Sequence, residues 1–249
     1  MTYDPLKVAA QLERIVTKEN TRKYYRFRAD RWYGGIATAD CVGCPLRCVF
    51  CWSDFPRDHP RKAGKFYTPE DVFNRLDSIA RKRNLAQLRI SGNEPTLGKE
   101  HLLKVLTLVE QSNYSFMLET SGVLIDEEYA RSLAPFKNVH VRVSLKGTTP
   151  EEFSKLTGAS PRTFKLQLDA IAHCLDAGVS AHPSAMLSFS SRENIQKLLD
   201  QLESVKPGLS RELEKEYVIL YPNVIKRLKD AGIKPHTAYR PDGVPLELI

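Results

Sequence analysis

Short stretches that are apolar, or that alternate apolar with polar residues, occur along most of the chain between longer stretches in which apolar residues recur every three or four positions. The first pattern predicts buried β-strands, and the second predicts helices with one buried face. The predicted strands cover residues 35–41, 87–91, 114–119, 139–145, 179–187 and 217–221. Strands that alternate with helices form parallel sheets with right-handed crossovers. Six strand–helix units therefore predict an α/β fold, an incomplete (β/α)6 barrel with parallel strands.

Capping residues mark the starts of several helices. Thr68 and Thr149 are each followed by a proline and then by two acidic residues, which is a typical helix start. Residues 190–193 predict a capping box. Further helices are expected over residues 5–18, 125–134 and 224–231, and near residues 102–109 and 164–175. Cys174 lies beside the last of these apolar stripes, so we expect it to be a small buried apolar residue.

The length of 249 residues suits one large α/β domain with a full core. We divide it into residues 1–34, a helix with a basic and aromatic segment, and residues 35–249, the barrel with a C-terminal helix. No apolar run is long enough to span a membrane, and the N-terminus lacks the hydrophobic region of a signal peptide. An odd number of cysteines, five, argues against a disulfide framework, and a cysteine-rich metal loop belongs in a reducing compartment. We therefore expect a cytoplasmic protein without membrane contact.

Three cysteines, Cys44, Cys48 and Cys51, lie on one short segment. Three thiolates can hold three corners of a cubic iron–sulfur cluster, which normally takes four. A metal site that lacks one protein ligand is typical of a site that binds something else there. The alternative is a structural zinc site in which Cys41 supplies the fourth thiolate, although zinc ligands usually form two separated pairs.

The spacing of these cysteines, with Phe50 directly before the last of them, resembles the signature of radical S-adenosylmethionine (SAM) enzymes. The resemblance implies a [4Fe–4S] cluster on Cys44, Cys48 and Cys51, and SAM chelated by the remaining iron through its amino and carboxylate groups. An electron supplied by a reductant such as ferredoxin or flavodoxin would then cleave SAM to a 5′-deoxyadenosyl radical. The same resemblance implies a radical SAM barrel as the fold.

The end of the second predicted strand continues with Gly92, Asn93, Glu94 and Pro95, which resembles the Gly-Gly-Glu-Pro motif of radical SAM enzymes. The resemblance implies that this segment binds SAM and that Glu94 receives its amino group. Asn93 stands where the family has a second glycine. Because asparagine tolerates a left-handed backbone, we expect Asn93 to adopt one.

Polar residues also lie at the ends of the next two predicted strands and within the fifth. The resemblance implies SAM contacts for Thr120 and Ser121, although small polar residues are also ordinary turn formers. It implies the same for Lys146 and, in place of a family carboxylate, Ser144; the alternative for Lys146 is a solvated loop lysine. His182 could contact the adenine or ribose of SAM, or it could be a buried histidine with a satisfied hydrogen bond.

The substrate is the least determined feature of the sequence. The short chain and these strand ends resemble activating-type radical SAM enzymes, which implies hydrogen abstraction from a protein residue or a small molecule. Residues 22–33 interleave five cations with five aromatic residues, a composition that suits RNA, and the sequence at residues 49–52 resembles the cluster loop of wyosine-forming tRNA enzymes. A tRNA-modifying enzyme is therefore the alternative. A non-enzymatic RNA-binding protein with a zinc loop is the second alternative.

Overall fold

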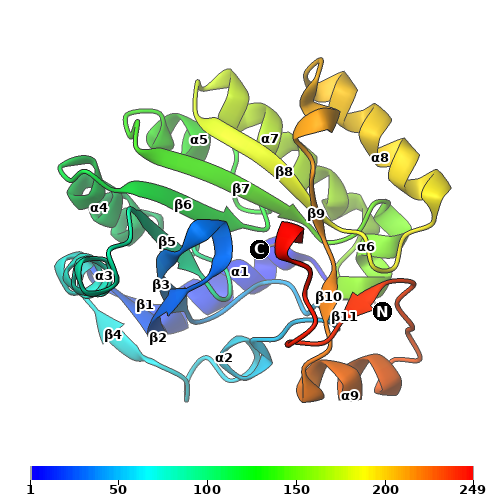
Figure 1. Ribbon diagram of the computed structural model, residues 1–249, viewed down its shortest axis with the longest axis horizontal. Coiled ribbons are helices and arrows are strands. Elements are labelled where there is room, and N and C mark those ends of the chain that lie inside the picture. The colour runs from blue at the N-terminus through cyan, green and yellow to red at the C-terminus, as the bar shows by residue number, and fades with distance from the viewer. Residues whose placement is uncertain (1, 249) are drawn as a thin grey trace.

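The computed structural model describes residues 2–248, and in this range nine strands form one sheet in the order β1-β2-β3-β5-β6-β7-β8-β9, with β4 paired to β2. Each strand from β3 to β9 along this order runs parallel to its neighbour, and the sheet curves into a partial barrel (Figure 1). The parallel strands are β3 (Ile36–Cys41), β5 (Gln87–Ser91), β6 (Ser115–Thr120), β7 (Val139–Leu145), β8 (Ser180–Met186) and β9 (Glu214–Glu216). The α/β fold and the parallel strands predicted from the sequence are confirmed.

Helices connect the parallel strands and cover the outer face of the sheet (Figure 1). They are α3 (Pro69–Arg83), α4 (Lys99–Glu110), α5 (Glu127–Leu133), α6 (Pro150–Thr157), α7 (Lys165–Asp176) and α8 (Arg192–Val205). Apolar side chains from these helices and from the strands form the main core. Cys174 on α7 is fully buried in this core, as the sequence predicted.

The basic and aromatic segment is a strand of the sheet, which the sequence analysis did not predict. It forms β2 (Thr21–Asp30), which pairs antiparallel with β3, and it follows α1 (Pro5–Val16) and β1 (Thr17–Lys18). The other edge of β2 pairs with β4 (Lys65–Tyr67). The division of the chain after residue 34 stays a prediction, and β2 and β3 on its two sides are hydrogen-bonded neighbours.

The predicted sixth strand over residues 217–221 is wrong in position. The sixth parallel strand is β9, three residues earlier, and its sequence Glu-Lys-Glu has no apolar signal. Part of the predicted range instead forms β10 (Val218–Ile219), which pairs with β11 (Ala238–Tyr239). The strand is polar because both of its glutamates pair with Arg142 of β7 inside the barrel.

Helix caps follow the sequence at two of the three predicted sites. The side chains of Thr68 and Thr149 accept hydrogen bonds from the first turns of α3 and α6. At α8 the cap is Ser191, which accepts from the backbone of Asn194, whereas Ser190 donates to Glu152 at 2.6 Å. The predicted capping box over residues 190–193 is therefore wrong, because Ser190 is engaged by α6.

Two further helices lie at the edge of the barrel where the parallel strands end, α2 (Asp54–Asp58) and α9 (Pro222–Asp230) (Figure 1). Short 3-10 turns complete the chain: η1 (Trp32–Gly34), η2 (Pro161–Phe164), η3 (Leu209–Glu212) and η4 (Leu246–Leu248). Within residues 2–248, no helix combines the length and the apolar character that crossing a membrane requires.

His101 on α4 should make the fold sensitive to acid. Burial lowers its pKa from 6.5 to about 4, against the hydrogen bond that its Nδ1 makes to Asn20 O at 2.9 Å. Since the unfolded chain binds this proton more readily, stability is complete above pH 6.5 and is lost as the pH falls towards 4. The loss should reach about 3 kcal/mol.

Urea unfolding of the wild type and of a His101→Gln variant between pH 4 and pH 7 measures this contribution. The variant should show a smaller fall of the unfolding free energy with acid, and a His236→Gln control at an exposed position should match the wild type. An identical pH dependence in the His101→Gln variant would contradict the assignment.

Candidate cofactor and substrate site

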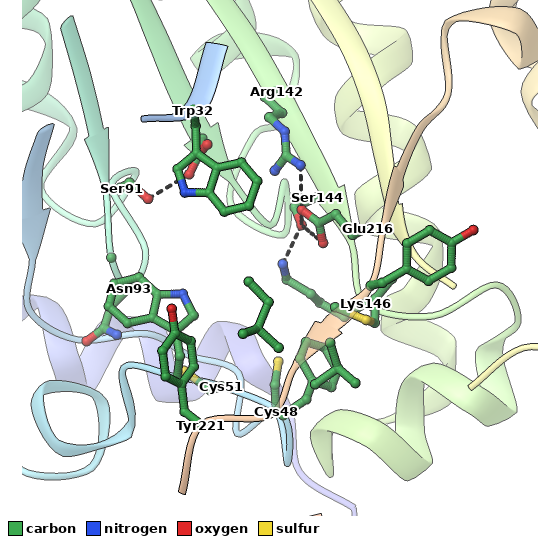
Figure 2. A pocket seen from close by; sticks show the side chains of 18 of the residues that line it. Trp32, Cys48, Cys51, Ser91, Asn93, Arg142, Ser144, Lys146, Glu216 and Tyr221 are labelled. Atoms are coloured by element: carbon green, nitrogen blue, oxygen red, sulfur yellow. Dashed lines mark hydrogen bonds and ion pairs between the residues drawn. The ribbon is translucent and has the colours of Figure 1, made fainter. Parts of the chain in front are cut away.

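A cavity of about 770 Å³ opens at the carboxyl ends of the parallel strands (Figure 2). Three groups of side chains line it: the cysteine loop, polar residues at the strand ends, and aromatic residues from η1, from the two sides of β10 and from β11. Active sites of parallel barrels gather at this end of the strands. The sequence-predicted residues on its wall are Cys44, Cys48, Phe50, Cys51, Gly92, Asn93, Glu94, Thr120, Ser121, Ser144 and Lys146.

Hydrogen bonds from three neighbouring elements hold the cysteine loop. Arg57 of α2 donates to Cys48 O at 2.7 Å, and Arg227 of α9 donates to Val49 O at 3.0 Å and to Cys51 O. The backbone of Val49 also donates to Leu156 O at the end of α6, at 2.9 Å. Neither arginine could be predicted from the sequence, because both lie outside the cysteine motif and reach it only through the fold.

Cys41 does not belong to the cavity wall. It is fully buried at the end of β3 and packs in the main core, whereas Cys44, Cys48 and Cys51 line the cavity. Across residues 2–248, no group of three or more His, Cys, Asp or Glu side chains is arranged to hold a single metal ion. The four-cysteine zinc site is therefore not assembled.

The cavity thiols are weak acids in the absence of a metal. Burial raises the pKa of Cys48 to about 11, and the positive charge of Lys146 opposes this shift. The pKa of Cys51 is also raised by burial, against the charges of Arg57 and Arg227. Because thiolates are the ligands, metal binding must release these protons.

Glu94 joins the ends of β5 and β6. Its buried carboxylate accepts hydrogen bonds from Thr96 Oγ1 at 2.7 Å, from Thr120 Oγ1 at 2.6 Å and from the backbone N of Ser121 at 3.0 Å. The hydroxyl of Ser121 donates to it as well, at 2.5 Å. Thr120 and Ser121 thus hold Glu94, and contacts of these residues with SAM remain predictions.

The expected left-handed backbone of Asn93 is wrong. The positive φ falls one residue earlier, at Gly92 (97°), where a Cβ would lie 3.0 Å from the backbone of Asp40. The Asn93 side chain accepts from the backbone N of Gly43 at 2.9 Å and donates to Ser53 O at 3.0 Å. Asn93 therefore links the end of β5 to residues on both sides of the cysteine loop. A glycine at this position has no side chain to form these hydrogen bonds. Pro95 is buried and does not line the cavity.

Lys146 extends from the end of β7 into the cavity, where its ammonium points towards Ser144 (Figure 2). Its Nζ donates to Ser144 Oγ at 2.5 Å, and Ser144 donates in turn to the carboxylate of Glu216 at 3.0 Å. Lys146 is half-buried, so it is not the solvated loop lysine that was the alternative.

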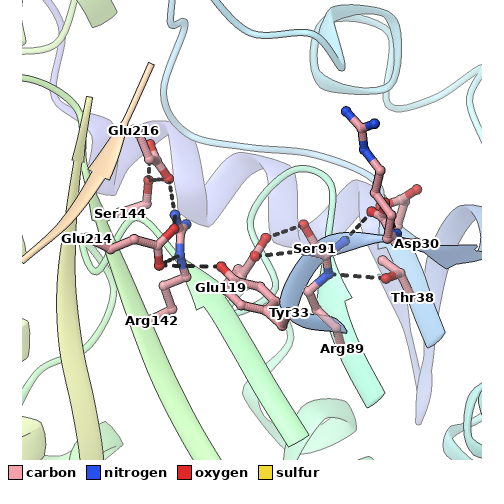
Figure 3. A network of polar contacts seen from close by, with 12 residues as sticks. Asp30, Tyr33, Thr38, Arg89, Ser91, Glu119, Arg142, Ser144, Glu214 and Glu216 are labelled. Atoms are coloured by element: carbon pink, nitrogen blue, oxygen red, sulfur yellow. Dashed lines mark hydrogen bonds and ion pairs between the residues drawn. The ribbon is translucent and has the colours of Figure 1, made fainter. Parts of the chain in front are cut away.

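A network of charged side chains forms another part of the cavity wall (Figure 3). Arg89 pairs with Asp30 at 2.5 Å and with Glu119 at 2.9 Å, while Arg142 pairs with Glu214 and Glu216, both at 2.6 Å. Burial disfavours the ionised form of Glu214, but Arg142 and His182 lower its pKa to about 2. The pKa values of the other three carboxyls are lowered as well by their arginine partners, so all four are ionised at neutral pH.

His182 does not line the cavity. Its Nε2 lies 3.0 Å from Glu214 Oε2, and its Nδ1 lies 2.5 Å from Nε2 of His140. Both ring nitrogens therefore have partners within the barrel, as in the alternative reading of a buried histidine with satisfied hydrogen bonds.

Four cationic side chains of β2 form hydrogen bonds or ion pairs within the protein. Arg22 is fully buried and donates to Glu94 O at 2.7 Å, and Lys23 donates to Pro60 O at 2.6 Å. Arg26 and Arg28 both pair with Asp40, at 2.6 Å and 2.9 Å. Each of these four cations therefore has an acceptor within the protein.

Comparison with known proteins identifies the family. A model of the Radical SAM superfamily matches residues 40–202, which include the cysteine loop and the strands from β5 to β8. The chain therefore belongs to the radical SAM superfamily. Members of this superfamily are enzymes that use a [4Fe–4S] cluster and SAM and need a reductant. The zinc-loop alternative is thereby overturned.

Curated relatives carry several reactions. The probable GTP 3',8-cyclase of Pyrobaculum aerophilum is 29% identical over 169 residues, 67% of this chain and 53% of that protein. The PqqA peptide cyclase of Granulibacter bethesdensis is 24% identical over 162 residues, 65% of this chain and 42% of that protein. The chain thus spans about half the length of the curated relatives it matches.

Solved structures agree on the fold. Streptococcus suis SuiB bound to its precursor peptide SuiA matches with a TM-score of 0.57 and 20% identity over 71% of this chain and 37% of SuiB. Native anSMEcpe with bound AdoMet matches with a TM-score of 0.57 and 20% identity over 73% of this chain and 50% of that chain.

Proposed function

We propose that this chain cleaves SAM reductively and uses the resulting radical to take a hydrogen atom from an organic substrate held in the cavity. The observation that carries the proposal is the opening of Cys44, Cys48 and Cys51, without Cys41, onto one cavity beside Lys146. Three thiolates and one open side suit a [4Fe–4S] cluster that keeps an iron free for another ligand. When bound, the cluster supplies the electron that breaks the sulfonium bond of SAM.

The chain's own residues would bind and orient SAM. The ammonium of Lys146 lines the same cavity as the cysteines and would pair with the SAM carboxylate. Gly92 and Asn93 would bring backbone groups to its amino group. Phe50, whose ring stacks on Phe189 with centroids 5.7 Å apart, would form an apolar wall for the adenosyl group. The role of Glu94 would be to hold the strand ends in place, since its carboxylate already accepts several internal hydrogen bonds.

We infer a substrate that is a peptide, a protein residue or another molecule without a polyphosphate. Arg89 and Arg142, the buried arginines of the cavity wall, already carry carboxylate partners and therefore offer little to phosphates. A peptide substrate also agrees with the similarity to PqqA peptide cyclase and to SuiB, which was solved with the precursor peptide SuiA. The tRNA alternative loses its main support because the cations of β2 are engaged within the fold.

We place the enzyme in the cytoplasm, where a reducing environment keeps the cysteine ligands as thiols. A ferredoxin or flavodoxin would be its electron donor.

Anaerobic reconstitution with iron and sulfide tests the proposal. The reconstituted chain should be brown, and with dithionite and SAM it should release 5′-deoxyadenosine and methionine in equal amounts, even without substrate. The products are measured by liquid chromatography. A chain that takes up the cluster but releases neither product would contradict the proposed activity, and the matched control is the same chain without iron.

A further inference from the structure

Helix α2 with the turn after it, residues 54–62, and helix α9 with its flanking residues, 221–234, form a surface that we call the α2–α9 surface. Both lie at the same edge of the molecule (Figure 1). Asn223 of α9 donates to Asp54 Oδ1 at 2.8 Å, and Arg227 of α9 pairs with the same carboxylate. The two segments therefore pack against each other through Asp54.

Exposed apolar side chains are concentrated on this surface and beside it. The structure describes seven large apolar residues as exposed, and four of them come from here: Phe55 (56%), Ile225 (49%), Trp52 (40%) and Tyr221 (37%). Trp52 and Tyr221 also line the cavity, whereas Phe55 and Ile225 do not. Exposed apolar groups rimmed by polar ones are typical of a protein-binding surface.

The charges around these side chains are mostly positive. Residues 54–62 and 221–234 carry seven Lys or Arg and three Asp in all. Arg61, Lys62, Lys226 and Lys229 are exposed, and Asp230 is engaged by Lys226. A partner for this surface should therefore be acidic, and a second copy of the same basic surface would be repelled.

The α2–α9 surface adjoins the cysteine loop. Arg57 on α2 donates to Cys48 O, and Arg227 on α9 donates to Cys51 O and Val49 O, so each half of the surface contacts the loop through one arginine. The same cysteines line the cavity, together with Arg57, Tyr221, Pro222 and Asn223 of this surface. A protein bound over Phe55 and Ile225, which do not line the cavity, would thus approach the cysteine loop from outside the cavity.

We propose that the α2–α9 surface is the docking site of an acidic one-electron carrier protein. The inference rests on the proposed function, which needs one electron at the cysteine loop for each SAM cleaved. Phe55 and Ile225 would form the apolar core of the interface with this carrier. The surrounding lysines guide the carrier to the surface and make the association dependent on salt.

Charge reversal at the surface tests the assignment. We compare the wild type with a Lys62→Glu, Lys226→Glu, Lys229→Glu variant, using reduced acidic flavodoxin or dithionite as the electron source. The variant should raise the KM for flavodoxin about tenfold at low ionic strength, because steering by complementary charge is lost. Its dithionite-driven release of 5′-deoxyadenosine should stay at the wild-type rate, since dithionite needs no docking surface. A Phe55→Ser variant should weaken flavodoxin use in the same selective way.

The matched control carries Lys7→Glu, Lys82→Glu and Arg83→Glu, three exposed positions on α1 and α3, and has the same net charge as the variant. An unchanged flavodoxin KM in the surface variant, or an equal rise in the control, would overturn the proposal. So would sedimentation that shows the surface buried in a dimer.

Direct binding of oxidised flavodoxin to the reconstituted chain, measured by calorimetry, separates this inference from the proposed function. Binding that weakens about tenfold in the surface variant supports the docking site even if SAM is not cleaved. Equal affinity of the wild type and the surface variant for flavodoxin would overturn the docking site even if SAM cleavage succeeds.

Discussion

A Cys48→Ser substitution should abolish both the iron–sulfur cluster and SAM cleavage, whereas Cys41→Ser should preserve both. Cys48 lines the cavity, where two cavity thiols would remain after its loss, too few to hold a cubic cluster. Cys41 is buried in the core at the end of β3 and does not reach the cavity wall. Serine fills the space of its thiol, so the fold should lose at most about 1–2 kcal/mol.

Iron and sulfide per chain, measured after anaerobic reconstitution, give the first readout, and release of 5′-deoxyadenosine gives the second. Cys174→Ser is the matched control, since this thiol is also buried and lies on α7 within the main core. It should keep the full metal content. If Cys41→Ser loses the metal as completely as Cys48→Ser, the site uses four thiolates and our assignment of three is wrong.

The parallel part of the fold could be predicted because its strands carry local apolar signals. The predicted strands over residues 87–91 and 139–145 have the same bounds in the structure, since each alternates apolar with polar residues and is followed by glycine or a polar turn. The helix starts at Thr68 and Thr149 could also be predicted, because each capping side chain and the backbone N–H that it accepts from lie within three residues. Signals of this kind depend only on neighbours in the sequence.

The polar network could not be predicted from local patterns. Arg89, Glu119, Arg142 and Glu214 occupy inward positions on four strands, and each pair is joined only when the strands come into register. Strand β9 could not be predicted for the same reason. Its glutamates are typical of a loop, and only their ion pairs with Arg142 explain why they lie in a strand. Polar residues at every second position of successive strands were the available signal.

The cysteine loop has one feature that the sequence predicts and one that it does not. Its spacing, visible in eight residues, was enough to predict the cofactor. The arginines that hold its carbonyls, Arg57 and Arg227, are separated by 170 positions of sequence and meet the loop only through the packing of α2 and α9.

A Glu94→Ala substitution should destabilise the protein and reduce SAM cleavage together. The carboxylate accepts hydrogen bonds from Thr96, Thr120 and Ser121, and all of these donors are buried. Their loss of a partner should lower the free energy of unfolding by about 3 kcal/mol. Since Glu94 joins the ends of β5 and β6 at the cavity wall, the release of 5′-deoxyadenosine should fall about 100-fold, the usual effect of a misplaced binding group.

Urea unfolding and the SAM dependence of 5′-deoxyadenosine release, measured on the same preparations, distinguish positioning from direct binding by Glu94. Glu94→Gln should be milder, at about 1–2 kcal/mol, because the amide keeps one acceptor oxygen and the serine and threonine hydroxyls can rotate, whereas the backbone N–H of Ser121 cannot. Glu128→Ala, a glutamate on α5 whose side chain is 81% exposed, is the control and should change neither quantity. A Glu94→Ala protein with wild-type stability and a raised KM for SAM would mean that Glu94 contacts SAM directly, and the positioning role would be wrong.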